Sequence, residues 1–429
     1  MAENEKRLPY SIGQFSGGWL LVIGLLLALI VVGAYAYSQQ FTEGESVTGL
    51  RNIGTMKGVT WGLYVAMYIY LIGLSFAGIT LAVLTRIFQW DSLKPVSRIA
   101  ELLAVVAIIS GGLLIIADVG QPIRAMKNLF MYARPQSPLF GTFTLVIAGE
   151  LFAGFVYFFL EGRRDAAIMA RKGGRFEAFY RLWASGYKDT KAEKARRETS
   201  SFWLAIGILP LMVAAFSTVG FVFGLQVGRP GWFSALQAPG FIVLATLSGI
   251  GFLAVIAAIL RKQLGAEKIL DMKTFRAIAI AMISLNLIYV YFMIIEWLSS
   301  FYSAQQTEVV IANALISGDY SQLYWLTLAL LILSLGLLVY QFISGRYSIA
   351  MIAVSGVLVN FAAIGRRYLI VVPSQTHGQL LPYGIASYNP TWIEYAVVFG
   401  LMAFSALIFV LFIKVFPVFK LPEITEGGA

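Results

Sequence analysis

The chain lacks cysteine altogether and has a single histidine, His377. Without cysteine it has no disulfide, no thiolate nucleophile and no ligand set for an iron–sulfur cluster. A single histidine also excludes a bis-His haem and a multi-His metal site. We therefore expect no haem, iron–sulfur cluster or other metal centre of its own. Any redox role must then use cofactors that partner proteins hold.

Charged residues are scarce. They make up 13% of the 429 residues, whereas hydrophobic residues make up 59%, and the mean hydropathy is +0.78. Soluble domains carry about 25% charged residues, and a water-soluble protein of this size could not keep so much apolar surface out of water. The composition therefore predicts an all-α integral membrane protein.

A membrane-spanning helix needs about 20 consecutive, mainly apolar residues. The first such run is too long for the apolar core of a signal peptide and has no small-residue cleavage site, so we expect it to be a span. Ten runs reach spanning length: 17–38, 59–86, 97–118, 139–161, 202–224, 233–260, 274–300, 321–343, 347–370 and 391–416.

Basic residues in the loops predict the orientation of these spans. Loops on the side of the N-terminus hold roughly three quarters of the 32 Lys and Arg residues, and such loops are usually cytoplasmic. We therefore predict that both termini are cytoplasmic and read the net charge of +10 as a topology signal, not as a nucleic-acid site. The basic cytoplasmic loop 162–200 is either a solvated loop in contact with lipid or, at the run "FEAFYRLW", a short amphipathic helix at the membrane surface.

A faint repeat organises the spans. "AGI" at 77–79 and "AIIS" at 107–110 return as "SGI" at 248–250 and "AMIS" at 281–284. Parallel repeats occur in membrane proteins, so we predict two four-helix bundles, spans 2–5 and spans 6–9, with the first and last spans at the periphery. The corresponding division of the chain is 1–58, 59–224, 225–372 and 373–429.

Ionisable residues inside spans cost about 2.5–3.5 kcal/mol each on insertion scales, which makes them candidates for function. Asp118, Glu296 and Glu394 fall near the outer ends of their spans, and Glu150 lies in mid-span. Arg366 and Arg367 close span 9 on the outer side. The alternative for the five outer residues is that they reach water at helix ends.

Aromatic residues begin the second span. Trp61, Tyr64 and Tyr68 are spaced i, i+3, i+7, which predicts a common helix face. That face is either an aromatic belt against lipid or the wall of a flat apolar pocket beside Asp118. An acid beside aromatic walls suits a quinol, whose hydroxyl proton a carboxylate can accept. His377, in the outer loop 371–390, is either a plain surface residue or a protonatable group at the pocket mouth.

Several of these segments resemble a known family. "WGLYVAMYIYLIGLSFAG", "PVSRIAELLAVVAIISGGLLIIADVGQP", "EWLSSFYS" and "GRRYLIVVPS" followed by "LPYGIASYNPTWIEYAV" are similar, in order and spacing, to motifs of the NrfD-like polysulfide reductase membrane subunits. The likeness covers about residues 55–420 and is strongest to the ten-span branch found in Hmc and Dsr complexes and alternative complex III.

The resemblance implies a subunit that binds quinone, such as a menaquinone-type lipid, near the outer face of a bacterial or archaeal cell membrane. A ferredoxin-like iron–sulfur subunit would dock there, with larger molybdopterin or multihaem cytochrome subunits beyond it. Asp118 matches the acid linked to quinol protons, although Gln121 replaces the family's usual arginine. The candidates for the quinone pocket are then Trp61, Tyr64, Tyr68, His377, Arg366 and Arg367. The candidates for a proton path are Glu150, Glu296 and Glu394, and the subunit becomes a candidate for proton translocation.

Two other functions fit the same pattern. A proton-coupled secondary transporter would also use repeats and buried acids, and it would favour broken spans; Pro210 is the clear mid-span proline. A membrane anchor without an active quinone site is the other alternative. In each case the chain would not catalyse a redox reaction alone. The direction of electron flow, the quinone type and the terminal substrate are left open.

Overall fold

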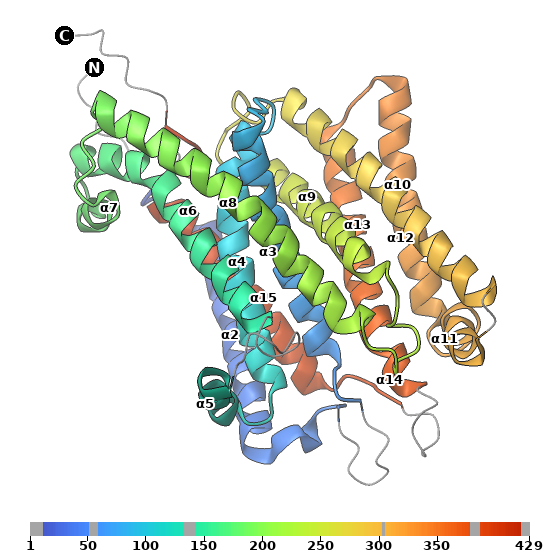
Figure 1. Cartoon of the computed structure of the whole chain (residues 1–429). Helices are drawn as coiled ribbons and strands as arrows, with labels where there is room; N and C mark the ends of the chain where they lie inside the picture. The colour runs from blue at the N-terminus through green and yellow to red at the C-terminus, as the bar shows by residue number, and fades with distance from the viewer. Residues whose placement is uncertain (1–11, 51–58, 133–142, 303–304, 378–386, 422–429) are drawn as a thin grey trace.

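The computed structural model describes all residues except 1–11, 51–58, 133–142, 303–304, 378–386 and 422–429 (Figure 1). The described part is helical and contains ten helices long and apolar enough to cross a membrane, which confirms the predicted number of spans. The helices are α2 (Gly17–Glu43), α3 (Leu63–Ile87), α4 (Lys94–Asp118), α5 (Pro122–Tyr132), α6 (Phe143–Lys172), α7 (Glu177–Ala184), α8 (Lys191–Gly224), α9 (Gln237–Gln263), α10 (Met272–Tyr302), α11 (Gln306–Ile316), α12 (Ser321–Ser344), α13 (Ile349–Val371), α14 (Pro373–Thr376) and α15 (Trp392–Val415), with a 3₁₀ turn η2 (Gly44–Val47) after α2.

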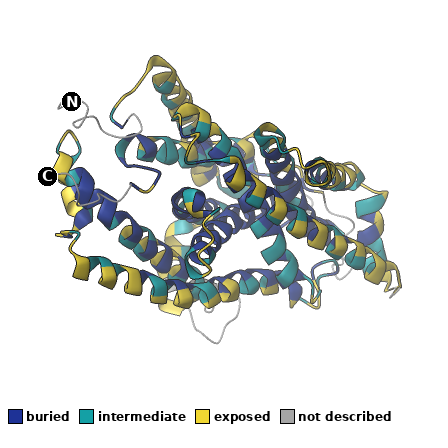
Figure 2. Ribbon diagram, turned by 90° about the horizontal axis from the view of Figure 1, so that it is seen from above, coloured by how far each residue is buried: buried dark blue, intermediate teal, exposed yellow. Residues whose placement is uncertain are grey.

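The spans form two four-helix groups with a peripheral pair. Helices α3, α4, α6 and α8 pack around one another as the first bundle, and α9, α10, α12 and α13 as the second. Helix α2 packs against α15, and α15 packs against α4. Viewed from above, buried residues gather in the middle of the molecule and exposed residues lie on its outward faces (Figure 2). This arrangement agrees with the predicted bundles and peripheral spans.

The two bundles meet where α3 packs against α9. At the contact, a Cβ atom on Gly249 would lie 2.1 Å from the Cβ of Ala77, so α9 approaches α3 this closely only with glycine there. Small residues allow such close approach between membrane helices. Ala77 and Gly249 belong to the repeated motifs "AGI" and "SGI", so corresponding parts of the two repeats lie against each other.

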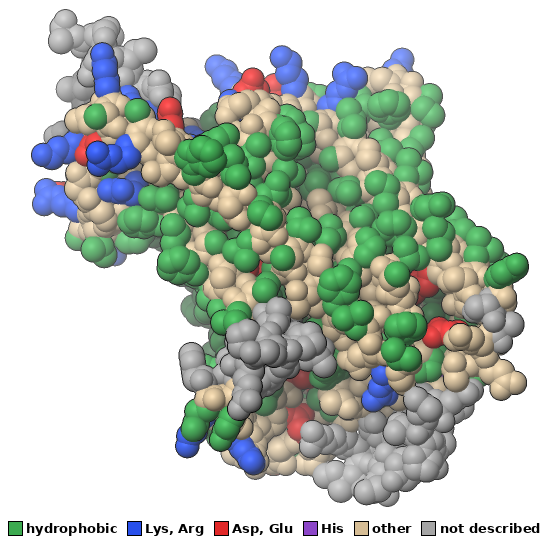
Figure 3. All heavy atoms as spheres, in the orientation of Figure 1, with side chains coloured by type: hydrophobic (Ala, Val, Ile, Leu, Met, Phe, Trp, Pro, Cys, Tyr) green, Lys and Arg blue, Asp and Glu red, His purple; other side chains and the backbone are tan. Residues whose placement is uncertain are grey.

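Both ends of the described chain lie at one end of the molecule, where the N–H of Gly13 donates to the carbonyl of Lys414 at 2.9 Å. We call this the inner end, following the predicted orientation, and the opposite one the outer end. Lys and Arg side chains gather at the inner end on the face shown in Figure 3.

The predicted cytoplasmic loop 162–200 is mostly helical. Helix α6 continues to Lys172, and α8 begins at Lys191, where Thr190 and Glu193 form a capping box. Such a box satisfies free N–H groups at a helix start and so extends α8 into the basic segment. Between the two lies α7, a helix at the position of "FEAFYRLW", which agrees with the helical alternative for this run.

Candidate functional site

A cavity of about 260 Å³ lies at the outer end of the second bundle. Residues of α10, α11 and α13 line most of it, and the segment before α9, Tyr324 of α12 and the start of α14 complete the lining. One part of the lining is apolar, with Met293, Trp297, Ile311, Leu315, Tyr324, Leu369 and Ile370; the other is polar, with Ser234, Glu296, Ser299, Ser300, Gln305, Glu308, Arg366 and Ser374. We call it the outer cavity.

Two residues predicted from the sequence meet in this cavity. Arg366 of α13 forms an ion pair with Glu296 of α10, and its Nε donates to the hydroxyl of Tyr289 at 3.2 Å. The Arg366 side chain is buried, and the carboxylate of Glu296 remains partly accessible at the cavity wall. A charge-assisted pair of this kind is held in orientation more firmly than a neutral contact.

A second carboxylate, which was not predicted from the sequence, faces the same cavity. Glu308 accepts the N–H of Gly231 through both carboxylate oxygens, each at 3.1 Å. Its partial burial raises its pKa, and the nearby Glu296 raises it further, while the Gly231 N–H opposes both. The sequence feature that could have indicated Glu308 is the apolar run 306–316, which has one acidic residue in its first turn.

The first bundle carries a separate polar cluster at the outer end. The hydroxyl of Tyr64 donates to the Oε1 of Gln40 at 2.8 Å, and the Nε2 of Gln40 donates to the carbonyl of Ala117 at 2.9 Å. Asp118, the last residue of α4, directly follows Ala117, whose carbonyl accepts this bond. The predicted outer site is therefore divided: Asp118 and Tyr64 belong to this cluster, and Glu296 and Arg366 to the outer cavity.

Glu394 holds the start of α15 against neighbouring parts of the chain. It caps α15 by accepting the N–H of Thr391 at 2.9 Å, and it accepts the N–H of Gly49 at 2.8 Å and the hydroxyl of Tyr388. Its side chain is fully buried among these donors. The carboxylate ties three chain segments together, so it does not line the outer cavity as a free proton acceptor would.

The predicted aromatic face is not formed. Helix α3 begins at Leu63, so Trp61 precedes the helix and cannot share a face with Tyr64 and Tyr68. Trp61 stacks on Trp232, with ring centroids 5.6 Å apart. The indole N–H of Trp232 in turn donates to the carbonyl of Ile370, so Trp61 lies behind the outer cavity. Tyr68 is buried inside the first bundle.

Two further residues predicted for the quinone pocket, Arg367 and His377, do not line the outer cavity. Arg367 points away from its neighbour, donates to the carbonyl of Phe241 at 3.1 Å and lies over its ring at 4.1 Å. Adjacent helix residues face directions about 100° apart, which explains the divergence. His377 follows α14, where its ring nitrogen is 2.9 Å from the hydroxyl of Thr376 and its ring meets that of Tyr320 edge-on.

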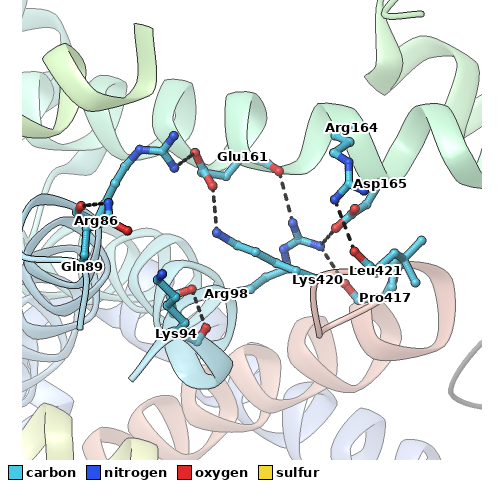
Figure 4. Close-up of polar contacts among 11 residues, drawn as sticks. Arg86, Gln89, Lys94, Arg98, Glu161, Arg164, Asp165, Pro417, Lys420 and Leu421 are labelled. Carbon is cyan, nitrogen blue, oxygen red and sulfur yellow. Dashed lines mark hydrogen bonds and ion pairs between the residues drawn. The ribbon is translucent and has the colours of Figure 1, made fainter. Parts of the chain in front are cut away.

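A second cavity, of about 590 Å³, lies at the inner end of the first bundle. Figure 4 shows the ionic network along it: Glu161 accepts from Arg86 at 2.5 Å and from Lys420 at 3.0 Å, and Arg98 pairs with Asp165. Arg98 also donates to the carbonyl of Pro417, which fastens the C-terminal segment to the bundle. We call this space the inner chamber; its Arg and Lys residues therefore do more than mark the topology, which is the only role predicted for them from the sequence.

Two buried acids in the first bundle keep an oxygen without a hydrogen-bond partner among the described residues. Glu101 lines the inner chamber, and its Oε2 is one such atom. Glu150, in mid-span, accepts the hydroxyl of Ser75 at 3.2 Å through Oε1, and its Oε2 is the other. Glu101 was detectable as the lone acid in the apolar stretch "IAELLAVV".

Comparisons with known proteins agree with this architecture. Residues 51–378 match the family described as polysulphide reductase, NrfD. A subunit of the selenate reductase of Mesobacillus selenatarsenatis is 24% identical over 93% of this chain and 94% of its own length. The Hdr-like menaquinol oxidoreductase integral membrane subunit of Archaeoglobus fulgidus is 25% identical over 93% of both chains.

A third relative is similar over a shorter stretch. A candidate membrane subunit of the dimethyl sulfoxide reductase of Halobacterium salinarum is 36% identical over 58% of this chain, and the chain spans about half, 52%, of that relative's length. The family match covers most of the chain, including both bundles and the outer cavity. The chain is therefore a multi-pass integral membrane protein of the NrfD polysulphide reductase family.

Proposed function

We propose that this protein is the quinone-reactive membrane subunit of a respiratory oxidoreductase complex and that the outer cavity holds the quinone ring. The observation that carries the proposal is the pairing of Glu296 with Arg366 on the polar side of a cavity whose other side is apolar. Ligand pockets commonly combine apolar walls with a few polar groups that orient the ligand. The relatives named as reductase and menaquinol oxidoreductase subunits support the same assignment.

The chemistry of quinol oxidation suits these side chains. A quinol gives up two protons and two electrons to become a quinone. Glu296 can accept a hydroxyl proton while Arg366 keeps its carboxylate in place, and Glu308 can take the proton onward to the outer surface. Two carboxylates in different environments are a common arrangement for proton transfer. In the reverse direction, the same groups return two protons to a reduced quinone.

The electrons need an acceptor outside this chain, because the sequence has no cysteine and one histidine. We propose that an iron–sulfur protein docks at the outer end beside α11 and exchanges electrons with the quinone. Larger molybdopterin or cytochrome subunits would continue the chain. The transporter alternative gains no support from α8, which continues as one helix through Pro210.

The test is quinol turnover by the complex purified through this subunit. Glu296→Gln removes the proton acceptor with little change in shape, and we expect a loss of about 100-fold or more. Asp319→Asn, an acid outside the lining of the outer cavity, serves as the matched control and should retain full activity. If Glu296→Gln is normal and Asp118→Asn is severely impaired, the quinone site lies in the first bundle instead.

A second role, proton uptake from the inner side, rests on Glu101 and Glu150. We propose that water in the inner chamber delivers protons to Glu101, that Glu150 is the next acid toward the outer end, and that an equal number of protons leaves at the outer end, because quinol oxidation itself consumes none. A buried acid with an unsatisfied oxygen is a natural proton-binding site in a membrane. In proteoliposomes, Glu150→Gln should abolish proton uptake from the inner side while quinol oxidation continues; unchanged uptake would refute this role.

A further inference from the structure

A third cavity, of about 630 Å³, lies between the peripheral helices α2 and α15 and the two bundles. Residues of α2, α3, α4, α9 and α15 line it, and it shares no lining residue with the outer cavity or the inner chamber. Its lining runs from Phe252 to Gln263 on α9 and from Met402 to Ile413 on α15. Each stretch is about 16 Å long at 1.5 Å per residue, which is about half of a 30 Å hydrocarbon core. We call this space the inner-leaflet pocket.

The inner-leaflet pocket is polar at its inner end and apolar toward the middle of the membrane. Three lining residues have a hydroxyl or amide side chain. Ser16 and Gln263 lie at the inner end, at the start of α2 and the end of α9. Ser405 lies deeper, but its hydroxyl bonds to that of Ser110 at 2.6 Å. The deeper part therefore presents mainly hydrocarbon to whatever fills it.

Two positive features meet at the inner end of this pocket. The first is the start of α2, where the side chain of the N-cap Ser16 accepts no helix N–H and the first turn has no acidic residue. The N–H groups of such a turn have no partner within the helix, and a helix N-terminus carries about half a positive charge. The second is the ammonium of Lys414, which lies 4.2 Å from the ring centre of Trp19 in the same turn. Trp19 itself lines the pocket.

Lys414 is buried without a counter-charge. The residue is 2% exposed, and its ammonium makes no ion pair or hydrogen bond within the part of the chain that the structure describes. The ring of Trp19 attracts the cation but does not neutralise it. A buried ammonium without an anion is costly, and the positive start of α2 beside it adds repulsion. An anion at this point would contact Lys414, the free N–H groups and the Ser16 hydroxyl.

We infer that the inner-leaflet pocket binds an anionic phospholipid, with a hydrocarbon chain along α9 and α15 and the phosphate at Lys414 and the start of α2. The phosphate supplies the missing counter-charge, and the chain fills the space between the peripheral helices and the bundles. A free phosphate would leave the apolar part of the pocket empty, and a lipid without net charge would leave Lys414 without its counter-charge. The inference goes beyond the proposed function and does not depend on it.

The test of the charged end measures lipid binding to the full chain in detergent by native mass spectrometry. Phosphatidylglycerol, which is anionic, and phosphatidylcholine, which has no net charge, are the probes. The wild-type chain should bind phosphatidylglycerol about tenfold more tightly, because its phosphate accepts charge-assisted hydrogen bonds without a competing cation in the headgroup. Lys414→Gln should remove this preference and retain phosphatidylcholine binding. Lys268→Gln, at an exposed lysine outside the lining, is the matched control and should keep the preference.

The test of the apolar part uses Ala406→Trp, which places a large ring in the pocket from α15. It should weaken binding of both lipids by about tenfold. Leu411→Trp, at an exposed position of the same helix outside the lining, is its control and should leave both affinities unchanged. Thermal unfolding of each variant without added lipid shows whether the fold is retained. Added phosphatidylglycerol should raise the unfolding temperature of the wild-type chain but not that of Lys414→Gln.

Several results would overturn the inference. The wild-type chain could show no preference for phosphatidylglycerol, or Lys414→Gln could keep it. Inorganic phosphate could stabilise the wild-type chain as much as phosphatidylglycerol does, which would indicate a site for a free anion. A long-tailed quinone could displace phosphatidylglycerol, which would give the pocket a different occupant. Equal lipid binding by Ala406→Trp and Leu411→Trp would place the hydrocarbon chain elsewhere. None of these results bears on the proposed function, which quinol turnover tests.

Discussion

Glu296 of α10 and Arg366 of α13 form an ion pair whose two side chains differ in exposure, 35% for the carboxylate and 5% for the guanidinium. The pair joins two helices of the second bundle at the wall of the outer cavity. A buried charge that loses its partner is more costly than an exposed one. The two residues therefore should not be equivalent in mutagenesis.

Replacing Glu296 by Leu leaves the buried guanidinium of Arg366 without its counter-charge. We expect a loss of about 3 kcal/mol in the free energy of unfolding. The double variant Glu296→Leu/Arg366→Met removes both charges and should recover most of the lost stability. Reversible unfolding in detergent or bicelles measures the free energy of unfolding of the single and the double variant. Equal destabilisation in the single and double variants would show that the pair does not bear on stability.

Gly249→Ala tests the contact between the two bundles. The added Cβ would lie 2.1 Å from that of Ala77, so α9 must move away from α3. Overpacking of this kind costs about 1–3 kcal/mol. Gly336→Ala on α12 meets nothing within 4 Å and should be neutral or slightly stabilising, because alanine favours a helix. Thermal unfolding of the two variants separates the effects; equal behaviour would contradict the close packing.

Glu308 gives a pH dependence whose sign follows from its raised pKa. The folded protein binds this proton more tightly than the unfolded chain, so the contribution of Glu308 to stability falls as pH rises from about 4 through the raised pKa. Glu308→Gln removes that fall. We expect the stability difference between variant and wild type to grow in favour of the variant as pH rises. A difference that is constant with pH would contradict the raised pKa.

Arg98→Gln tests how the C-terminal segment is held. Arg98 pairs with Asp165 and donates to the carbonyl of Pro417 at 3.3 Å. Loss of the guanidinium should loosen residues 416–421, which hydrogen–deuterium exchange would register as faster amide exchange there. Arg171→Gln, at a basic residue whose hydrogen bond stays within α6, is the control and should leave exchange in this segment unchanged.

The number of spans and their grouping were predictable because both depend on hydrophobic length and on the repeat. The site was only partly predictable. Glu296 and Arg366 were found because charges inside a span are rare. Which charge pairs with which depends on helix rotation and packing, so the sequence could not separate Arg366 from Arg367. The prediction of an aromatic face was wrong because α3 begins at Leu63, with Gly62 as its N-cap, so Trp61 lies before the helix.

Glu308 and the inner chamber were not predicted from the sequence, and each has a physical reason. Glu308 lies on α11, which is shorter than a membrane span and so was not among the predicted helices. The inner chamber was not predicted because the orientation of the spans already accounts for basic residues at the inner end. Their pairing with Glu161 and Asp165 emerges only when α3, α4 and α6 are placed side by side.

The most direct test of the proposed site is photolabelling of the purified complex with a quinone that carries a reactive group on its ring. We expect labelled peptides from the outer half of α10, from α11 and from the end of α13, all of which line the outer cavity. An excess of native quinol should prevent the labelling. Labelling confined to residues 61–68 and Asp118, with α10 and α11 unmodified, would contradict this account and place the quinone in the first bundle.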